Sequence, residues 1–162
     1  MTINVLGIDL GTNVGWAVCR DGKIVASGVA AFHGVADKGY GAMFAAFRRF
    51  LAGVRRDHGP FAAIAYELPF HRGAITSRIT GGMAAHIMER AYTWRCRALP
   101  VQTMTLKKAA TGSGKAGKPE MIEAAWKIKC RSGHPLEVPG EHEADAIHVA
   151  RWGDAVVRKE RA

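Results

Sequence analysis

Two short apolar runs in this chain each end in an acidic residue. The first run covers residues 3–8 and is followed by Asp9 and Gly11, and the second covers residues 61–66 and is followed by Glu67. Short apolar runs bounded by glycine or proline are typical of buried strands. Burying an ionised carboxylate is costly unless a positive or hydrogen-bonding partner lies against it. A turn-forming role for Asp9 is the simpler alternative. The second apolar run also ends in an acidic residue, Glu67, and this repeated placement favours a shared site.

An Asp-Gly pair at positions 21–22 separates two further apolar runs. Asp-Gly is a strong hairpin signal because both central residues of a type I′ turn need positive φ. The sequence therefore predicts an antiparallel hairpin after the first strand. Strands are expected at 3–8, 16–19, 24–29, 61–66 and 99–102, and helices at 39–58, 75–96, 119–130 and 141–157, with a loop-rich stretch at 107–118.

This order of elements predicts an α/β domain with a mixed five-stranded sheet, an antiparallel hairpin plus parallel strands, flanked by helices. We expect one domain over residues 1–158 and a short tail at 159–162. Gly81 and Gly82 lie inside the helix expected at 75–96, where each costs roughly 1 kcal/mol relative to alanine. Close approach of another helix or backbone would explain them, and a break in the helix is the alternative.

The chain is strongly basic, with 23 Lys and Arg against 14 Asp and Glu and a formal charge of +9. This excess favours a polyanionic partner, most simply nucleic acid. Cys19, Cys96 and Cys130 form no zinc or disulfide pattern, so we expect reduced, mostly buried thiols. No apolar run approaches the roughly 18 residues of a membrane span, and no secretory segment is visible. We expect a cytoplasmic protein without a membrane partner.

The last expected helix begins with four polar residues of interest. His142 and Asp145 are three residues apart, on the stripe that continues through apolar positions and faces the core. For this pair alone, a hydrogen bond at the helix end is the simplest explanation. Glu141 and Glu143 lie at other angles and are expected to be solvated acids at the helix start.

Considered together, Asp9, Glu67 and Asp145 suggest a single site. Asp9 and Glu67 fall at the same relative point of two strands that we expect to be neighbours, and the last helix would pack over their ends. Carboxylates gathered around one point repel each other without a cation. Magnesium prefers carboxylate oxygens and suits substrates that bring phosphate oxygens, and two such ions can promote phosphodiester hydrolysis. The cluster in a basic protein therefore predicts a metal-dependent nuclease.

Three segments resemble the RuvC family of Holliday-junction resolvases, within the RNase H-like superfamily. They are Gly-Ile-Asp-Leu-Gly at 7–11, Tyr-Glu at 66–67 and Glu-His-Glu-Ala-Asp-Ala at 141–146, and the match spans nearly the whole chain. The resemblance implies an RNase H-like fold and a homodimer that resolves four-way DNA junctions in recombination and repair. It also implies paired symmetric cuts, 5′-phosphate and 3′-hydroxyl ends, and two Mg²⁺ ions per site, with Mn²⁺ as an alternative. No nucleotide cofactor is expected. The resemblance further implies a protein of a bacterial cell, host- or phage-encoded.

The resemblance also implies roles for individual residues. Asp9, Glu67 and Asp145 would bind metal, and His142 would be a fourth ligand or would position water. Lys118 would act near the scissile phosphate, which completes the expected catalytic set. The DNA-binding residues expected from the resemblance are Phe70, Arg72, Arg78, Lys107 and Lys118. Lys108 and Lys115 are added because they lie in the same basic stretch at 107–118, for which a solvated surface loop is the alternative.

Two of these assignments involve the central part of the chain. Phe70 would stack at the opened centre of the junction, where unpaired bases offer an aromatic face; a packing role in a loop is the alternative. The helix at 75–96 corresponds to the dimer helix of the family, which would place Gly81 and Gly82 at a crossing of two copies.

Three other functions are compatible with parts of the sequence. The segment at 9–13 also resembles the first phosphate loop of actin-like and heat-shock ATPases, but no second such loop is visible. An RNase H-like nuclease acting on RNA or on other branched nucleic acid would reuse the same acids. A non-catalytic DNA-binding module is disfavoured, because acids without a metal would repel phosphates.

Overall fold

The computed structural model of the chain describes residues 2–69, 73–133 and 137–161. Its elements in chain order are β1 (Asn4–Asp9), β2 (Asn13–Arg20), β3 (Lys23–Ala31), α1 (His33–Ala36), α2 (Tyr40–His58), β4 (Ala63–Glu67), α3 (Ala74–Thr93), β5 (Arg97–Val101), α4 (Thr103–Thr111), α5 (Lys118–Arg131) and α6 (Glu141–Arg161).

The strands form one five-stranded sheet in the order β3-β2-β1-β4-β5. β1, β2 and β3 pair antiparallel, whereas β4 pairs parallel with both β1 and β5. The turn between β2 and β3 has positive φ at both central residues, 48° at Asp21 and 79° at Gly22. The predicted hairpin and the predicted mixed sheet are therefore confirmed.

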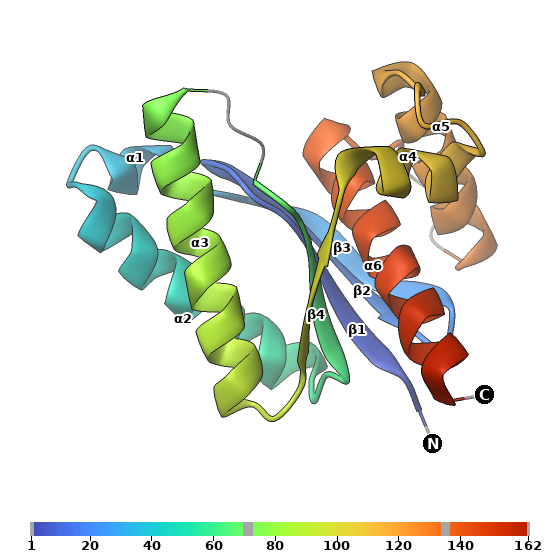
Figure 1. Cartoon of the computed structure of the whole chain (residues 1–162), viewed down its shortest axis with the longest axis horizontal. Helices are drawn as coiled ribbons and strands as arrows, with labels where there is room; N and C mark the ends of the chain where they lie inside the picture. Colours follow the sequence, from blue (N-terminus) through green and yellow to red (C-terminus); the bar gives the residue numbers. More distant parts are fainter. Residues whose placement is uncertain (1, 70–72, 134–136, 162) are drawn as a thin grey trace.

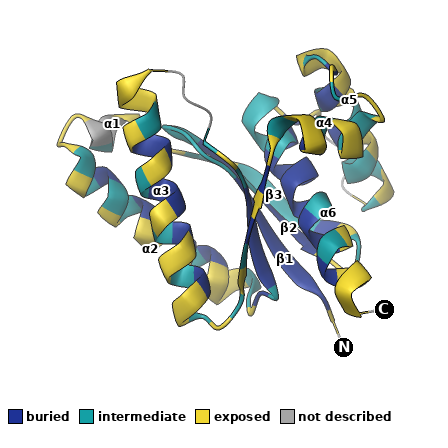
Figure 2. Cartoon of the chain, viewed as in Figure 1, coloured by how far each residue is buried: buried dark blue, intermediate teal, exposed yellow. Residues whose placement is uncertain are grey.

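Helices cover both faces of the sheet (Figure 1). On one face, α2 and α3 pack on a core that contains Leu6, Phe47 and Ile64. On the other face α6 lies across β1 and β2, with α4 and α5 beside it. The central strands and the middle of α6 are buried, whereas the outer surfaces of α2 and α3 are exposed (Figure 2).

Alternation along β1 decides which side chains meet α6. Leu6 and Ile8 point to the α2 and α3 face. Because successive side chains alternate between the two faces of a strand, Val5, Gly7 and Asp9 share the opposite face. β4 follows the same rule, so its terminal Glu67 also faces α6. Strand periodicity therefore directs both acids toward one helix.

α6 approaches the sheet closely because glycines lie beneath it. A Cβ atom added to Gly7 would come within 2.3 Å of the backbone nitrogen of Ala150. One added to Gly15 would come within 1.8 Å of the carbonyl oxygen of His142. Such distances exclude any side chain at these positions unless the helix moves. The two glycines thus set the height of α6 above β1 and β2.

Several expected boundaries were wrong. The stretch 107–118 is not all loop, because α4 continues to Thr111 and ends at Gly112, whose φ is 83°. α1 is an additional short helix that no pattern indicated. α6 continues to Arg161, into the residues that we assigned to a tail. Basic residues favour the last turn of a helix, which agrees with this longer end.

The two glycines of α3 have different surroundings. The helix is continuous from Ala74 to Thr93, so they do not break it. A Cβ atom on Gly82 would come within 2.2 Å of the Phe44 ring on α2, whereas one on Gly81 would meet nothing within 4 Å. Gly82 is therefore explained by close helix packing within the chain, and the crossing of two copies remains a hypothesis for Gly81 alone.

None of the described helices is long and apolar enough to cross a lipid bilayer. The three cysteines are free; Cys19 is buried, and Cys96 and Cys130 are half-buried.

We predict that Gly15→Ala destabilises the fold by at least about 2 kcal/mol, because the added methyl group must displace α6. Urea denaturation followed by circular dichroism measures the effect. Gly53→Ala in α2 is the matched control, since its methyl group meets nothing within 4 Å and should stabilise the helix by about 0.5–1 kcal/mol. Equal stability of Gly15→Ala and wild type would contradict the proposed role of this contact.

Candidate active site

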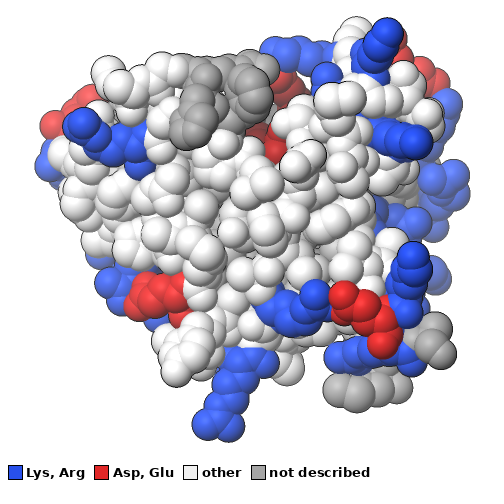
Figure 3. All heavy atoms as spheres, in the orientation of Figure 1, with Lys and Arg blue, Asp and Glu red and all other residues white. Residues whose placement is uncertain are grey.

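A pocket of about 410 Å³ opens at the carboxyl ends of β1 and β4. Parallel neighbouring strands carry their last residues to the same edge of a sheet, and Ile8 pairs with Tyr66 just before the two acids. In the view of Figure 3, acidic side chains lie near the upper edge of the molecule, close to Lys and Arg side chains on the side of α4 and α5. The polar residues that line the pocket are Asp9, Glu67, Thr76, Thr80, Thr103, Lys107, Lys118, Glu141 and Asp145.

The structure thus brings together the three carboxylates that the sequence singled out. Asp9 ends β1, Glu67 ends β4, and Asp145 lies one turn into α6. His142 joins them through Asp9, since its Nδ1 is 2.8 Å from Asp9 Oδ2. Their roles in metal binding and catalysis stay predictions.

Asp9 and His142 form a tight pair. The side chain of Asp9 is 15% exposed and that of His142 is 43% exposed. Burial raises the pKa of Asp9, although its hydrogen bond to His142 opposes the shift. The same hydrogen bond raises the pKa of His142. An ionised carboxylate can only accept, so Nδ1 donates to Asp9 and Nε2 is the ring nitrogen left for another contact.

Asp145 shows most clearly that negative charge accumulates here. Burial raises its pKa to about 7, and neighbouring carboxylates add to the shift. In decreasing order of effect, these are Asp9, Glu67 and Glu141; His142 opposes them. A pKa near 7 means that the surroundings of Asp145 do not balance the negative charge of its ionised carboxylate. The pocket therefore favours the binding of a cation.

Glu141 is a site residue that the sequence interpretation missed. Its Oε1 lies 2.7 Å from Lys118 Nζ, and both side chains line the pocket. We expected a solvated acid at the helix start, but the spacing of four residues between Glu141 and Asp145 puts both on one helix face. That spacing was the signal available in the sequence.

Glu143 was also expected to be a solvated acid at the helix start, and this was wrong. Its side chain is only 15% exposed, and its Oε1 accepts from Lys129 Nζ at 2.9 Å and from Ser27 Oγ at 2.6 Å. Glu143 is therefore a half-buried link between α6, α5 and β3. It holds α5, which begins with Lys118, against the helix that carries Asp145.

Thr103, at the start of α4, is a second residue that the sequence interpretation did not include. Its hydroxyl group donates a hydrogen bond to Glu67 Oε1. No sequence motif marked Thr103, and no helix was expected at its position. This contact ties the carboxylate of Glu67 to α4.

The expected DNA-binding residues lie at different places. Lys107 and Lys118 line the pocket, Lys107 from α4 and Lys118 from the start of α5. Lys108 on α4 and Lys115 between α4 and α5 are exposed. Arg78 is exposed on α3, with its guanidinium 5.8 Å from the centre of the Tyr40 ring. Phe70 and Arg72 lie outside the described residues.

The donor types in the pocket fit a hard divalent cation, but their present positions do not enclose one. Among residues 2–69, 73–133 and 137–161, no three His, Cys, Asp or Glu side chains are grouped closely enough to hold a metal ion. Three of the acids hold a protein partner instead: Asp9 holds His142, Glu67 holds Thr103, and Glu141 holds Lys118. Carboxylate and imidazole groups do bind such ions, so metal binding requires these side chains to move closer together.

No protein-family model and no curated protein sequence matches the chain. Among solved structures, RuvC of Thermus thermophilus is similar with a TM-score of 0.77 and 21% identity, over 99% of this chain and 97% of that one. The same protein in complex with Holliday junction substrate gives a TM-score of 0.78 and 20% identity, over 97% and 96%. The chain has the fold of RuvC. A more distant similarity, with a TM-score of 0.56 and 11% identity over 99% of each chain, is to the Holliday junction resolvase of fowlpox virus. The predicted RNase H-like fold is therefore confirmed.

We predict that the metal-free protein loses stability as the pH rises from about 4 to about 7. The pKa of Asp145 is higher in the folded state than in the unfolded chain, so the folded state binds more protons in this range and unfolding becomes easier as they leave. Asp145→Asn removes this titration. The variant should therefore gain up to roughly 4 kcal/mol relative to wild type between pH 4 and 8.

Denaturation with urea in EDTA at several pH values measures this difference. Asp37→Asn, an exposed acid at the end of α1, is the control and should follow the wild-type pH dependence. Parallel curves for wild type and Asp145→Asn would show that the carboxylates do not interact as described.

Proposed function

We propose that this chain is a metal-dependent, structure-selective endonuclease that cuts four-way or other branched DNA with paired symmetric cuts. The observation that carries the proposal is the pocket, in which carboxylates from two strand ends and α6 meet lysines from α4 and α5. The RuvC fold supports it, since RuvC of Thermus thermophilus has been solved with Holliday junction substrate.

In this proposal Asp9, Glu67 and Asp145 hold Mg²⁺ or Mn²⁺. Two such ions would supply an activated water and stabilise the charge on the leaving oxygen of a phosphodiester. His142 keeps Asp9 oriented through Nδ1 and presents Nε2 for a metal or a water. Because the carboxylates are partly shielded from solvent, their electrostatic attraction for a bound cation is stronger than it would be in water.

Lys118 would exchange its partner when DNA arrives. Its side chain is 73% exposed and its ion pair with Glu141 lies at the pocket mouth. Exposed ion pairs contribute only about 0–1 kcal/mol, so a phosphate group can displace Glu141. Lys118 then contacts the scissile phosphate, and Lys107 contacts the neighbouring backbone. Both lysines lie on the rim of an acidic pocket, where they offset its repulsion of DNA.

The homodimer is part of the same proposal. Gly81, Ala85, Met88 and Tyr92 repeat at helical spacing along one exposed face of α3. Met88 is 51% exposed and Tyr92 is 86% exposed. An exposed stripe of this kind on a helix suits contact with a second copy. Two copies would present two pockets to one junction, as paired cuts require.

A substrate comparison tests the activity. Four-way junction, Y-fork, linear duplex and DNA–RNA hybrid, labelled on each strand in turn, are incubated with Mg²⁺, with Mn²⁺ or with EDTA. We expect metal-dependent cutting of branched DNA at symmetric positions and little cutting of linear duplex. Preferential cutting of the hybrid would assign the pocket to RNA, and an absence of cutting on all substrates would refute the nuclease.

We predict that Asp9→Asn, Glu67→Gln and Asp145→Asn each reduce cutting at least about a hundredfold, because each removes a charged donor from the metal-binding set. Junction affinity should stay within a few-fold of wild type, since no variant removes a positive charge. Single-turnover cleavage and gel-shift titration separate the two effects. Asp37→Asn should cut like wild type.

We predict that the combined Met88→Glu and Tyr92→Glu substitutions convert the protein to a monomer, because they place charges in the centre of the proposed α3 contact. Light scattering measures the mass. The control pair is Ala45→Glu with Ala52→Glu, two exposed positions on α2, and should leave the mass unchanged. A wild type that is monomeric at micromolar concentration, alone and with junction DNA, would remove this part of the proposal.

A further inference from the structure

The positive charge of the chain is concentrated at the end of the sheet opposite the pocket. β1, β4 and β5 begin there, and α2, α3 and α6 end there (Figure 1). We define this distal end as residues 20–23, 55–58, 94–97 and 158–161. It contains nine Lys and Arg against three Asp and Glu. The surplus of six is most of the net charge of +9, whereas the opposite end carries the acidic pocket.

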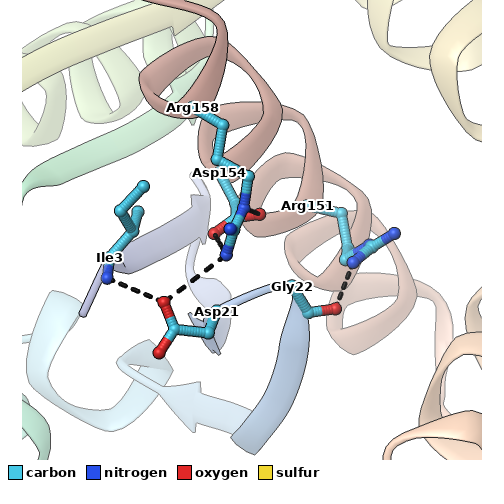
Figure 4. A network of polar contacts seen from close by, with 6 residues as sticks. All are labelled: Ile3, Asp21, Gly22, Arg151, Asp154 and Arg158. Atoms are coloured by element: carbon cyan, nitrogen blue, oxygen red, sulfur yellow. Dashed lines mark hydrogen bonds and ion pairs between the residues drawn. The ribbon is translucent and has the colours of Figure 1, made fainter. Parts of the chain in front are cut away.

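Side-chain contacts tie these segments into one surface. Arg158 Nη2 lies 3.6 Å from Asp21 Oδ1, which joins the end of α6 to the β2–β3 turn (Figure 4). Arg97, at the start of β5, pairs with Glu160. Arg20 donates to the carbonyl oxygen of His58 at 3.3 Å. The segments are therefore neighbours in space although they are far apart in sequence.

Every acid of the distal end already holds an arginine. Asp57 pairs with Arg56 at 2.8 Å, and Asp21 and Glu160 hold the partners given above. Behind this surface the buried Asp154 also holds Arg158, at 2.7 Å (Figure 4). Apart from Arg20, which donates to His58, five exposed cations remain with no carboxylate within 4.0 Å among the described residues. They are Lys23, Arg55, Arg95, Lys159 and Arg161.

Helix ends explain only part of this charge. Cations near a helix C-terminus are stabilised by the macrodipole, which corresponds to roughly half a negative charge per helix. Three helices end here, so they account for about one and a half charges of the surplus of six. The remainder repel one another across an exposed surface. A polyanion that covers the surface would remove this repulsion.

The aromatic residue of the distal end indicates which polyanion fits. Trp94 packs on the core cluster between the sheet and α2–α3, and the Arg55 guanidinium lies 4.9 Å from its ring centre. With these contacts on the ring, Trp94 is poorly placed to stack on an unpaired base, as single-strand binding sites usually require. A shallow recess of about 320 Å³ beside it is lined by Ala52, Arg55, Arg56 and Trp94. Guanidinium groups at such a recess suit phosphate oxygens.

We propose that the distal end is a second DNA-binding surface, which holds the phosphate backbone of duplex DNA away from the pocket. β1 has six residues and spans about 20 Å, so the two surfaces are well separated. Duplex DNA presents one charge per about 1.7 Å of its axis. Several of the five cations can therefore contact one stretch of backbone. This surface lies beyond the proposed active site and does not require that site to cut DNA.

The test uses the combined substitutions Lys23→Gln, Arg95→Gln and Lys159→Gln. None of these side chains has a hydrogen-bond or ion-pair partner among the described residues, so folding should be unaffected, as a thermal melt verifies. We expect affinity for a linear 30-base-pair duplex, measured in EDTA, to fall about tenfold or more at low salt. The slope of log affinity against log salt should become shallower by roughly 2–3. Junction cleavage at saturating protein should keep its wild-type single-turnover rate.

The control is Lys38→Gln with Arg49→Gln and Arg131→Gln, three exposed cations outside the distal end with the same loss of charge. It should keep the wild-type slope. If both triple variants behave alike, or if wild type does not bind linear duplex, the inference is wrong. Loss of binding to vesicles of anionic lipid with unchanged duplex affinity would also overturn it. Because duplex binding is measured without metal, failure of the nuclease proposal would leave this result interpretable.

Discussion

The contact between α6 and the glycines of β1 and β2 is the constraint on which the rest of the structure depends. Gly7 lies against Ala150, and Gly15 lies against the first turn of α6 at His142. Strand alternation then places Asp9 on the side of that same turn, within 2.8 Å of His142. The distance between Asp9 and Asp145 is thus a consequence of backbone packing. A residue larger than glycine at either position would displace α6 and so separate the acids, although it would contact none of them.

Close packing also concentrates charge, and the protein compensates for this only partly. His142 donates a hydrogen bond to Asp9, Lys118 neutralises Glu141, and Thr103 offers a neutral hydrogen bond to Glu67. Among the residues that the structure describes, Asp145 has no ion-pair partner within 4.0 Å, and burial together with its neighbours raises its pKa to about 7. Clustered carboxylates reduce stability when they are ionised without a counter-ion. A site of this kind gains stability when a cation binds, which couples metal affinity to the fold.

The sequence predicted the parts of the site that local periodicity determines. Asp9 and Glu67 could be placed because each ends a short apolar run, and parallel neighbours bring such ends together. The helix face of Asp145 followed from its apolar stripe. Glu141 was missed because the helix dipole offered a sufficient local explanation, although its spacing from Asp145 pointed to the pocket. Thr103 and the burial of Glu143 depend on α4 and α5 packing beside α6, and no pattern of period 2 or 3.6 reports such tertiary contacts.

The distribution of charge along the sheet follows from the same topology. Carboxyl ends of the parallel strands carry the acids of the pocket, while the distal end carries six of the nine net positive charges of the chain. The carboxylates of the pocket repel the phosphate groups of DNA, and beside the pocket only the lysines of α4 and α5 oppose this repulsion. Cations at the far end raise the local concentration of DNA without entering the pocket and without neutralising its carboxylates. Binding and metal coordination can then be separated by the length of the sheet, so that neither function weakens the electrostatics of the other.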